Sequence, residues 1–325
     1  MMRLEIPALL VLGLAIQEEP WPLSKPAPAV PLRPERLAEL AGYACASCHA
    51  EVADEWAATA HGIAWIDEVY QDALKDKRRP ESCHGCHAPE NLFGLAELAR
   101  PKVREGDRSL GVSCETCHAG AGGVVLGPRG TPVDAHPSQA PPSLSIPGSS
   151  ELCASCHSTN IGPVIGVAKD FVASDPEGRL RSCVGCHMAP VERKWASGEG
   201  VPLRSGRSHA LQTPRDPSFL RRAFQASWRT DGRNRVVIAN RAGHRVPGLI
   251  GREIRFQAEV LDASGAAIER AELRLDATAY LPVDARVEIP LAKAGSALRL
   301  VGEHLDPRAE KPVVFLDERL EPGGR

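Results

Sequence analysis

The ten cysteines are the residues of this chain best suited to chemistry, and they form five pairs of identical spacing. In every pair two residues separate the thiols, and a histidine directly follows the second cysteine. With 11 histidines in 325 residues, five such coincidences would arise by chance with a probability of about 10⁻⁷ or less. The five sets are Cys45, Cys48 and His49; Cys83, Cys86 and His87; Cys114, Cys117 and His118; Cys153, Cys156 and His157; and Cys183, Cys186 and His187.

This pattern is the attachment signal for c-type haem. The two thiols form thioethers with the haem vinyl groups, and the adjacent imidazole is the proximal ligand of the iron. Cysteine pairs of this spacing also occur in zinc half-sites and disulfide frameworks, but neither requires a histidine after every pair. We therefore predict five covalently bound c-type haems, with His49, His87, His118, His157 and His187 as proximal ligands.

The ligands on the opposite faces of the irons decide between an electron carrier and an enzyme. A haem with strong ligands on both faces passes electrons but binds no substrate, whereas a haem with one open face can do chemistry. The number of remaining histidines permits both cases. Met188 follows His187 directly and cannot reach the opposite face of the same haem, so we interpret it as a packing residue. The remaining histidines are His61, His84, His136, His209, His244 and His304.

The segment that carries the five motifs runs from Cys45 to His187, about 29 residues for each haem. So little chain cannot enclose each haem separately, so the haems must pack together in one protein coat. Outside the motifs, the residues from Gly120 to Ser150 indicate a loop, and Asp216 is a candidate helix cap. Apolar periodicity predicts short helices at Glu35–Leu40, Glu51–Ala64, Ile66–Lys77, Glu90–Leu98 and Pro217–Ser227.

Beyond Arg229 the pattern changes to alternation with period two, which is typical of half-buried strands. Asp262 to Gly265 is a predicted turn. The expected domain is antiparallel, free of cysteine and sandwich-like. Its strands are few for a closed sandwich, which leaves open an incomplete sheet or a truncated C-terminus. The predicted strands are Arg235–Asn240, Glu253–Asp262, Ala271–Leu275, Ala297–Glu303 and Pro312–Asp317.

The fold class that follows is a mainly irregular and α-helical multihaem domain packed around five haems, followed by the antiparallel β domain. Arg3 and the apolar stretch Ile6–Ile16 predict a secretory signal peptide. Export to the periplasm or the extracellular space follows, with no integral membrane span after signal cleavage. The predicted divisions are a signal peptide at 1–16, a proline-rich leader at 17–43, a pentahaem cytochrome c domain at 44–227 and the β domain at 228–325.

The overall composition agrees with bound haem. Aromatic residues make up only 4% of the chain, and flat apolar haems can replace their bulk in a core. The formal net charge of -2 disfavours a nucleic-acid partner. Two propionates on each of five haems would bring the net charge to roughly -12, which favours cationic partners or cationic contacts to the propionates.

Four stretches resemble the periplasmic multihaem cytochromes c related to the cytochrome c-552/554 and hydroxylamine-oxidoreductase group. The resemblance extends from Ala44 to about Asp317. The matching stretches are CASCHAEVADEWAATAH at Cys45–His61, GVSCETCH at Gly111–His118, SCVGCHMAP at Ser182–Pro190 and NRAGHRVPG at Asn240–Gly248.

The resemblance implies that His61, His136, His209 and His244 are distal ligands. The residues agree for His61, on an expected helix twelve residues after His49, and for His244, in a tight turn at the domain junction. His84 lies inside a haem-binding loop, so it cannot reach the far side of its own iron; it could bind a neighbouring iron or donate a hydrogen bond to a propionate. We expect His304, in a charged β segment, at the surface.

The favoured function is electron transfer between periplasmic or extracellular redox partners through closely packed, mostly bis-histidine haems. The β domain would then serve docking or assembly, including a homo-oligomer. The competing hypothesis is a reductase or oxidase of a small nitrogen or sulfur compound at one open haem, which needs proton donors or cations nearby. Every motif here ends in His, whereas pentahaem nitrite reductases typically use Lys at the active haem, so we favour a carrier over an enzyme.

Overall fold

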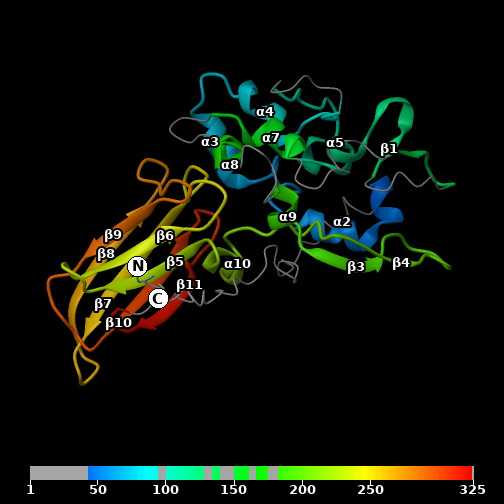
Figure 1. The fold of residues 1–325 in the computed structure, drawn as a ribbon. Coiled ribbons are helices and arrows are strands. Elements are labelled where there is room, and N and C mark those ends of the chain that lie inside the picture. The colour runs from blue at the N-terminus through cyan, green and yellow to red at the C-terminus, as the bar shows by residue number, and fades with distance from the viewer. Residues whose placement is uncertain are drawn as a thin grey trace, which may run out of the picture.

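A computed structural model of the chain describes residues 43–93, 100–127, 134–139, 150–160, 166–174 and 182–323. The predicted signal peptide, nearly all of the leader and the expected helix Glu35–Leu40 lie outside these residues. Figure 1 shows the strands β5 to β11 together in one part of the molecule and the helices that carry the cysteines in another. We call residues 44–223 the motif region and residues 224–320 the β region.

The motif region consists of short helices joined by turns and two small β pairs. Parallel β1 and β2 form one pair, and antiparallel β3 and β4 form the other. Its described elements are η1 Ala44–Ser47, α2 Ala50–Ala57, α3 Glu68–Lys75, α4 Glu81–His87, η2 Arg108–Leu110, α5 Cys114–His118, η3 Ala121–Gly123, β1 Val125–Leu126, β2 Ser138–Gln139, α7 Glu151–His157, α8 Val167–Ser174, α9 Cys183–His187, β3 Pro190–Lys194, β4 Leu203–Arg207 and α10 Pro217–Arg221.

The β region contains two antiparallel sheets. One has the strand order β11-β10-β7-β8 and the other β5-β6-β9. Burial alternates along the strands, as in β7, where every second residue is buried, because one face of each sheet packs inward. The strands are β5 Phe224–Arg229, β6 Arg235–Asn240, β7 Glu253–Leu261, β8 Ala267–Leu275, β9 Arg286–Pro290, β10 Ala297–Leu305 and β11 Val313–Leu320.

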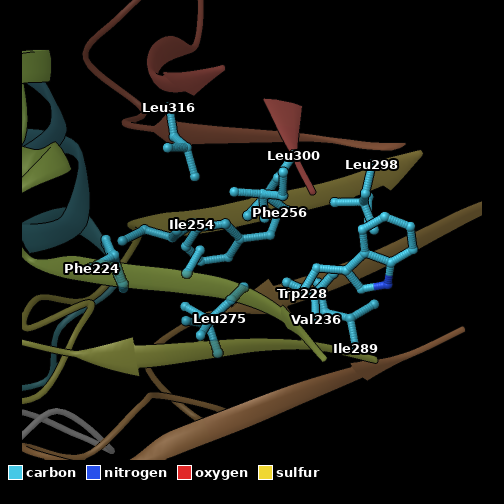
Figure 2. Close-up of a cluster of buried hydrophobic side chains, with 14 of the residues drawn as sticks. Phe224, Trp228, Val236, Ile254, Phe256, Leu275, Ile289, Leu298, Leu300 and Leu316 are labelled. Atoms are coloured by element: carbon cyan, nitrogen blue, oxygen red, sulfur yellow. The ribbon is translucent and has the colours of Figure 1, made fainter. Parts of the chain in front are cut away.

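The inward faces of the two sheets share one hydrophobic core. Figure 2 shows Trp228 and Val236 from one sheet packed with Phe256 and Leu298 from the other. The rings of Phe224, Phe256 and Phe315 also contact one another, with centroids 5.1 to 5.7 Å apart. Three of the six phenylalanines of the chain therefore lie in this core.

The described part of the motif region has no comparable protein core. Its hydrophobic cluster consists of Tyr43, Trp56 and Ala57, with four partly buried side chains around them. Two of those four are the motif cysteines Cys45 and Cys114. A region of this size needs more apolar volume than these residues supply to offset the entropy of ordering its chain.

Several predicted elements differ from the observed ones. The helix expected at Glu51–Ala64 ends at Ala57, and that expected at Ile66–Lys77 is Glu68–Lys75. Residues 90–93 of the helix expected at Glu90–Leu98 are not helical, and residues 94–98 lie outside the described residues. The helix expected at Pro217–Ser227 ends at Arg221, because β5 begins at Phe224.

The β5 strand begins at Phe224, four residues before the predicted start of the β domain at residue 228. Phe224, Ala226 and Trp228 alternate into the core, and β5 pairs with β6 along its whole length. The β9 strand at Arg286–Pro290 was not among the predicted strands; it completes the smaller sheet beside β6. The β region therefore has seven strands, two more than predicted.

Buried ion pairs join the β region to the motif region along a shared seam. Arg308 Nε, after β10, lies 2.6 Å from Asp67 Oδ2, just before α3. Arg245 Nε, after β6, lies 2.5 Å from Asp170 Oδ2 on α8. Among the described residues, no helix is both long enough and apolar enough to cross a membrane.

Candidate haem sites

Each Cys-x-x-Cys-His motif forms a turn of helix, which brings its three functional side chains together. We number the sites 1 to 5 in chain order. Sites 2 to 5 lie on α4, α5, α7 and α9, and site 1 lies on η1 and the two residues after it. In a helix, residues three and four apart share a face, so both thiols and the imidazole can meet one macrocycle. None of the ten cysteines is in a disulfide, and all except the exposed Cys48 are partly buried.

Backbone carbonyl groups orient four of the five proximal imidazoles. The Nδ1 atoms of His49 and His118 lie 2.5 Å from the oxygens of Trp195 and Leu126. Those of His87 and His187 lie 2.7 Å from the oxygens of Ala64 and Gln212. Since a carbonyl only accepts hydrogen bonds, Nδ1 carries the proton and Nε2 keeps a free lone pair for a metal.

Four proximal imidazoles each face a second imidazole from elsewhere in the chain. An iron bound on both sides, about 2.0 Å from each nitrogen, would separate the ring centroids by roughly 6 Å. The observed separations match this value, so the residues present fit bis-histidine haem. The centroid distances are 6.4 Å for His49–His136, 6.1 Å for His61–His157, 6.1 Å for His118–His209 and 6.3 Å for His187–His244.

Three of these facing histidines also have their Nδ1 atoms engaged. His209 Nδ1 lies 3.1 Å from the oxygen of Arg207, and His244 Nδ1 lies 2.8 Å from the oxygen of Arg245. His136 Nδ1 lies 3.1 Å from the hydroxyl of Ser138. Since a carbonyl only accepts, Nε2 of His209 and His244 remains available to a metal, and the Ser138 hydroxyl can act as an acceptor for His136 Nδ1 in the same way.

Desolvation favours the neutral, metal-binding form of six of the eight paired rings. Desolvation lowers the pKa of His61 and that of His209 to about 4. Burial also lowers the pKa of His118, His157, His187 and His244. A protonated imidazole has no lone pair to donate, so a lowered pKa favours ligation at neutral pH.

Site 2 differs from the other four sites. The ring of His87 stacks on Tyr70, with centroids 3.6 Å apart and planes within 6°. Within the described residues no imidazole faces His87, and the buried Tyr70 hydroxyl has no hydrogen-bond partner. The His84 ring lies 5.1 Å from that of Trp65, and no ring contact joins it to a proximal histidine.

Side chains from distant elements hold the facing histidines in place. The backbone N–H of His209 donates to Glu55 Oε2 of α2 at 2.8 Å, and Arg193 of β3 pairs with the same carboxylate. Asn240 at the end of β6 donates to the carbonyl oxygens of His244 and Leu281 at 2.9 and 3.1 Å. Sequence reasoning missed these supporting residues, because nothing in their spacing relates them to a motif.

His304 lies elsewhere than expected. It is 1% exposed, not at the surface, because it follows Leu298, Leu300 and Gly302 on the inward face of β10. Alternation along this strand was the signal that could have shown its burial. Neither ring nitrogen has a hydrogen-bond partner among the described residues.

Contacts between thiols give the order of the sites in space. Cys45 of site 1 interacts with Cys114 of site 3. Site 4 interacts with two sites, through Cys156 with Cys86 of site 2 and through Cys153 with Cys183 of site 5. Cys117 of site 3 lies close enough to both thiols of site 4 to interact electrostatically with them. The sites therefore run 1, 3, 4 and then branch to 2 and 5.

Comparisons with known proteins agree with this geometry. Residues 44–119, which include the first three motifs, match the family model described as "Cytochrome c554 and c-prime". A similar solved structure is that of a penta-heme cytochrome c552 from Thermochromatium tepidum, with a TM-score of 0.57 and 18% identity, covering 87% of this chain and 98% of that chain. No curated protein matches. The similar structure covers more of this chain than the motif region contains, so the similar fold includes strands of the β region.

Proposed function

We propose that this chain is a multihaem c-type cytochrome similar to the c552/c554 group and that it relays electrons between redox partners through five haems. The observation that carries the proposal is the set of four imidazole pairs 6.1 to 6.4 Å apart. In this assignment His136, His209, His61 and His244 are the distal ligands of sites 1, 3, 4 and 5. Two strong ligands leave an iron no place for substrate but allow it to change oxidation state.

The branched order of the sites supports a relay. Electrons would pass along sites 1, 3 and 4, whose thiols interact, and leave toward site 2 or site 5. Cys48 of site 1 is the one exposed motif cysteine, which makes this end of the row suitable for exchange with a partner. Imidazoles on both faces also favour lower potentials than a histidine and a methionine would give.

The β region has two roles in this proposal. It supplies His244 to site 5 from the loop that follows β6, and its outer faces are available for docking or assembly. The chain would act in the periplasm or outside the cell, after removal of the signal peptide at 1–16. The sequence resembles periplasmic cytochromes with covalently attached haem, and this resemblance supports the proposed location.

A second function is favoured at site 2 alone. Because no imidazole among the described residues lies opposite His87 at the separation of the other four pairs, this haem would keep an open face that can bind a small nitrogen or sulfur compound. Cyanide, nitrite and hydroxylamine added to the holoprotein test this function. A spectral change at one haem, together with turnover of nitrite or hydroxylamine, would support it, and no change with any of the three would refute it.

Replacement of single distal histidines tests the relay. We expect His61→Ala, His136→Ala, His209→Ala and His244→Ala each to convert one low-spin haem of the holoprotein to high spin. The reason is that alanine leaves one axial position without a strong ligand. Optical and paramagnetic-resonance spectra report the change.

His84→Ala is the matched control for these four variants. It removes the same side chain from a position that faces no proximal ring, so the number of low-spin haems should stay as in the unaltered holoprotein. If two or more of the four distal variants keep every low-spin signal, the assignment is wrong. Loss of a low-spin signal in His84→Ala would assign His84 as a ligand instead.

A further inference from the structure

Helix α8 packs closely against the loop that carries His244. The loop, residues 241–248, follows β6 and belongs to the β region, whereas α8 lies between sites 4 and 5. A Cβ on Gly243 would come within 2.8 Å of the Phe171 ring, so only glycine permits this approach. At the other end of the loop, Gly248 packs equally tightly on Val167. The Ser174 hydroxyl donates to the oxygen of Gly243 at 3.2 Å.

Asp170 lies between these packing contacts and takes three hydrogen bonds from Arg245. The side chain donates from Nε and Nη2 at 2.5 and 2.7 Å, and the backbone N–H of Arg245 donates at 3.3 Å. Both side chains are nearly buried, with 16% of Asp170 and 9% of Arg245 exposed. The guanidinium also lies 4.2 Å from the centroid of the Tyr280 ring. A planar, two-pronged pair of this kind fixes both position and orientation.

Arg245, which Asp170 binds, also orients His244. The oxygen of Arg245 lies 2.8 Å from Nδ1 of His244, so the held backbone sets the direction of the ring. The His244 and His187 rings lie within 14° of parallel at 6.3 Å. A continuous set of contacts therefore leads from the Asp170 carboxylate through Arg245 to the ring that faces site 5.

We propose that Asp170 is a positioning residue, which holds His244 in the geometry needed for axial ligation at site 5. The proposal rests on the ligation of site 5 by His244 given above. It implies that the contact between α8 and the β region forms in the same step in which His244 becomes the second ligand at site 5. Partners that orient a metal-bound histidine typically change metal affinity by about 10–100-fold when mutated.

Asp170→Asn in the holoprotein tests the proposal. Asparagine keeps the shape but loses the charge and one acceptor, so His244 should leave the iron more often. We expect one more cyanide-reactive haem than in the unaltered holoprotein, with cyanide affinity at that haem raised by about 10–100-fold. Arg245→Lys, which cannot make the two-pronged pair, should change the same haem in the same direction. Optical titration and paramagnetic resonance give the readout.

Asp67→Asn is the matched control, because it weakens another ion pair of the seam, between Asp67 and Arg308, without contact to the His244 loop. Its cyanide-reactive haems should match those of the unaltered holoprotein. If Asp170→Asn and Arg245→Lys both react like Asp67→Asn, Asp170 has no positioning role. His244→Ala separates this failure from that of the relay: if it leaves every low-spin haem unchanged, the ligation itself is wrong, and if it opens one haem, only the positioning role fails.

Discussion

At the scale of single residues, the histidines show how environment decides the use of one side chain. Eight of them form the four facing pairs. In five of these rings a carbonyl oxygen accepts from Nδ1 and leaves the Nε2 lone pair free. His304 is as deeply buried as any of these but has no partner for either nitrogen among the described residues. Burial lowers its pKa to about 4, although Asp306 acts in the opposite direction. Protonation of a buried imidazole of this kind destabilises the folded state.

His304 predicts how the stability of the β region depends on pH. Its pKa is about 4 in the folded state and about 6.5 in the unfolded state, so the unfolded chain binds the proton first as the pH falls. Between pH 7 and pH 5 this difference in pKa lowers the free energy of unfolding by about 2 kcal/mol. The loss begins near pH 6.5 and is complete near pH 4.

His304→Leu should remove this pH dependence, because leucine fills a similar volume and binds no proton. Urea unfolding of both holoproteins at pH 7 and pH 5 gives the free energies of unfolding. The difference between the two proteins should increase by about 2 kcal/mol in favour of the variant at pH 5. An equal loss in both proteins would show that the burial of His304 has no energetic consequence.

At the scale of elements, the strands were easier to predict than the helices. The edges of β6 and β7 agree with the sequence within a residue, because alternation with period two is visible wherever one face is polar. The helix expected over Pro217–Ser227 was too long, since apolar residues at 224, 226 and 228 already alternate as a strand. The partners of the proximal histidines lie far away in the sequence, so spacing alone could not pair His61 with His157. Only the tertiary fold brings them together.

The predicted cap of α10 is confirmed. The Asp216 carboxylate accepts from the backbone N–H groups of Ser218 and Phe219 at 2.9 and 3.2 Å. Asp216→Ala should lower the free energy of unfolding by about 1 kcal/mol, because both donors lose their acceptor. Ser218→Ala removes only the hydroxyl that also contacts Asp216 and serves as the control. Thermal unfolding that gives equal losses for the two variants would refute the capping role.

At the scale of the whole molecule, the two regions differ in what fills them. The β region has a protein core of large side chains, including Trp228, Phe256 and Leu300. The hydrophobic cluster of the described motif region has three buried residues, and the motif cysteines Cys45 and Cys114 pack against it. The described motif region therefore lacks a large protein core of its own, and bound haem would supply the missing volume.

This difference predicts what happens when haem is not attached. We expect the chain produced without haem to keep a protease-resistant β region, residues 224–320, while the motif region is digested. The physical reason is that only the β region buries enough apolar surface of its own. Limited proteolysis followed by mass spectrometry identifies the fragments, with the holoprotein as the control. Protection of residues 44–223 in the haem-free chain would contradict the interpretation.

The central claim is that four haems have two histidine ligands and that the haem at His87 has one. Quantitative paramagnetic resonance of the oxidised holoprotein, with the haem content measured on the same sample, tests it most directly. The account predicts five haems per chain, four low-spin and one high-spin. Five low-spin irons, or fewer than four, would contradict it.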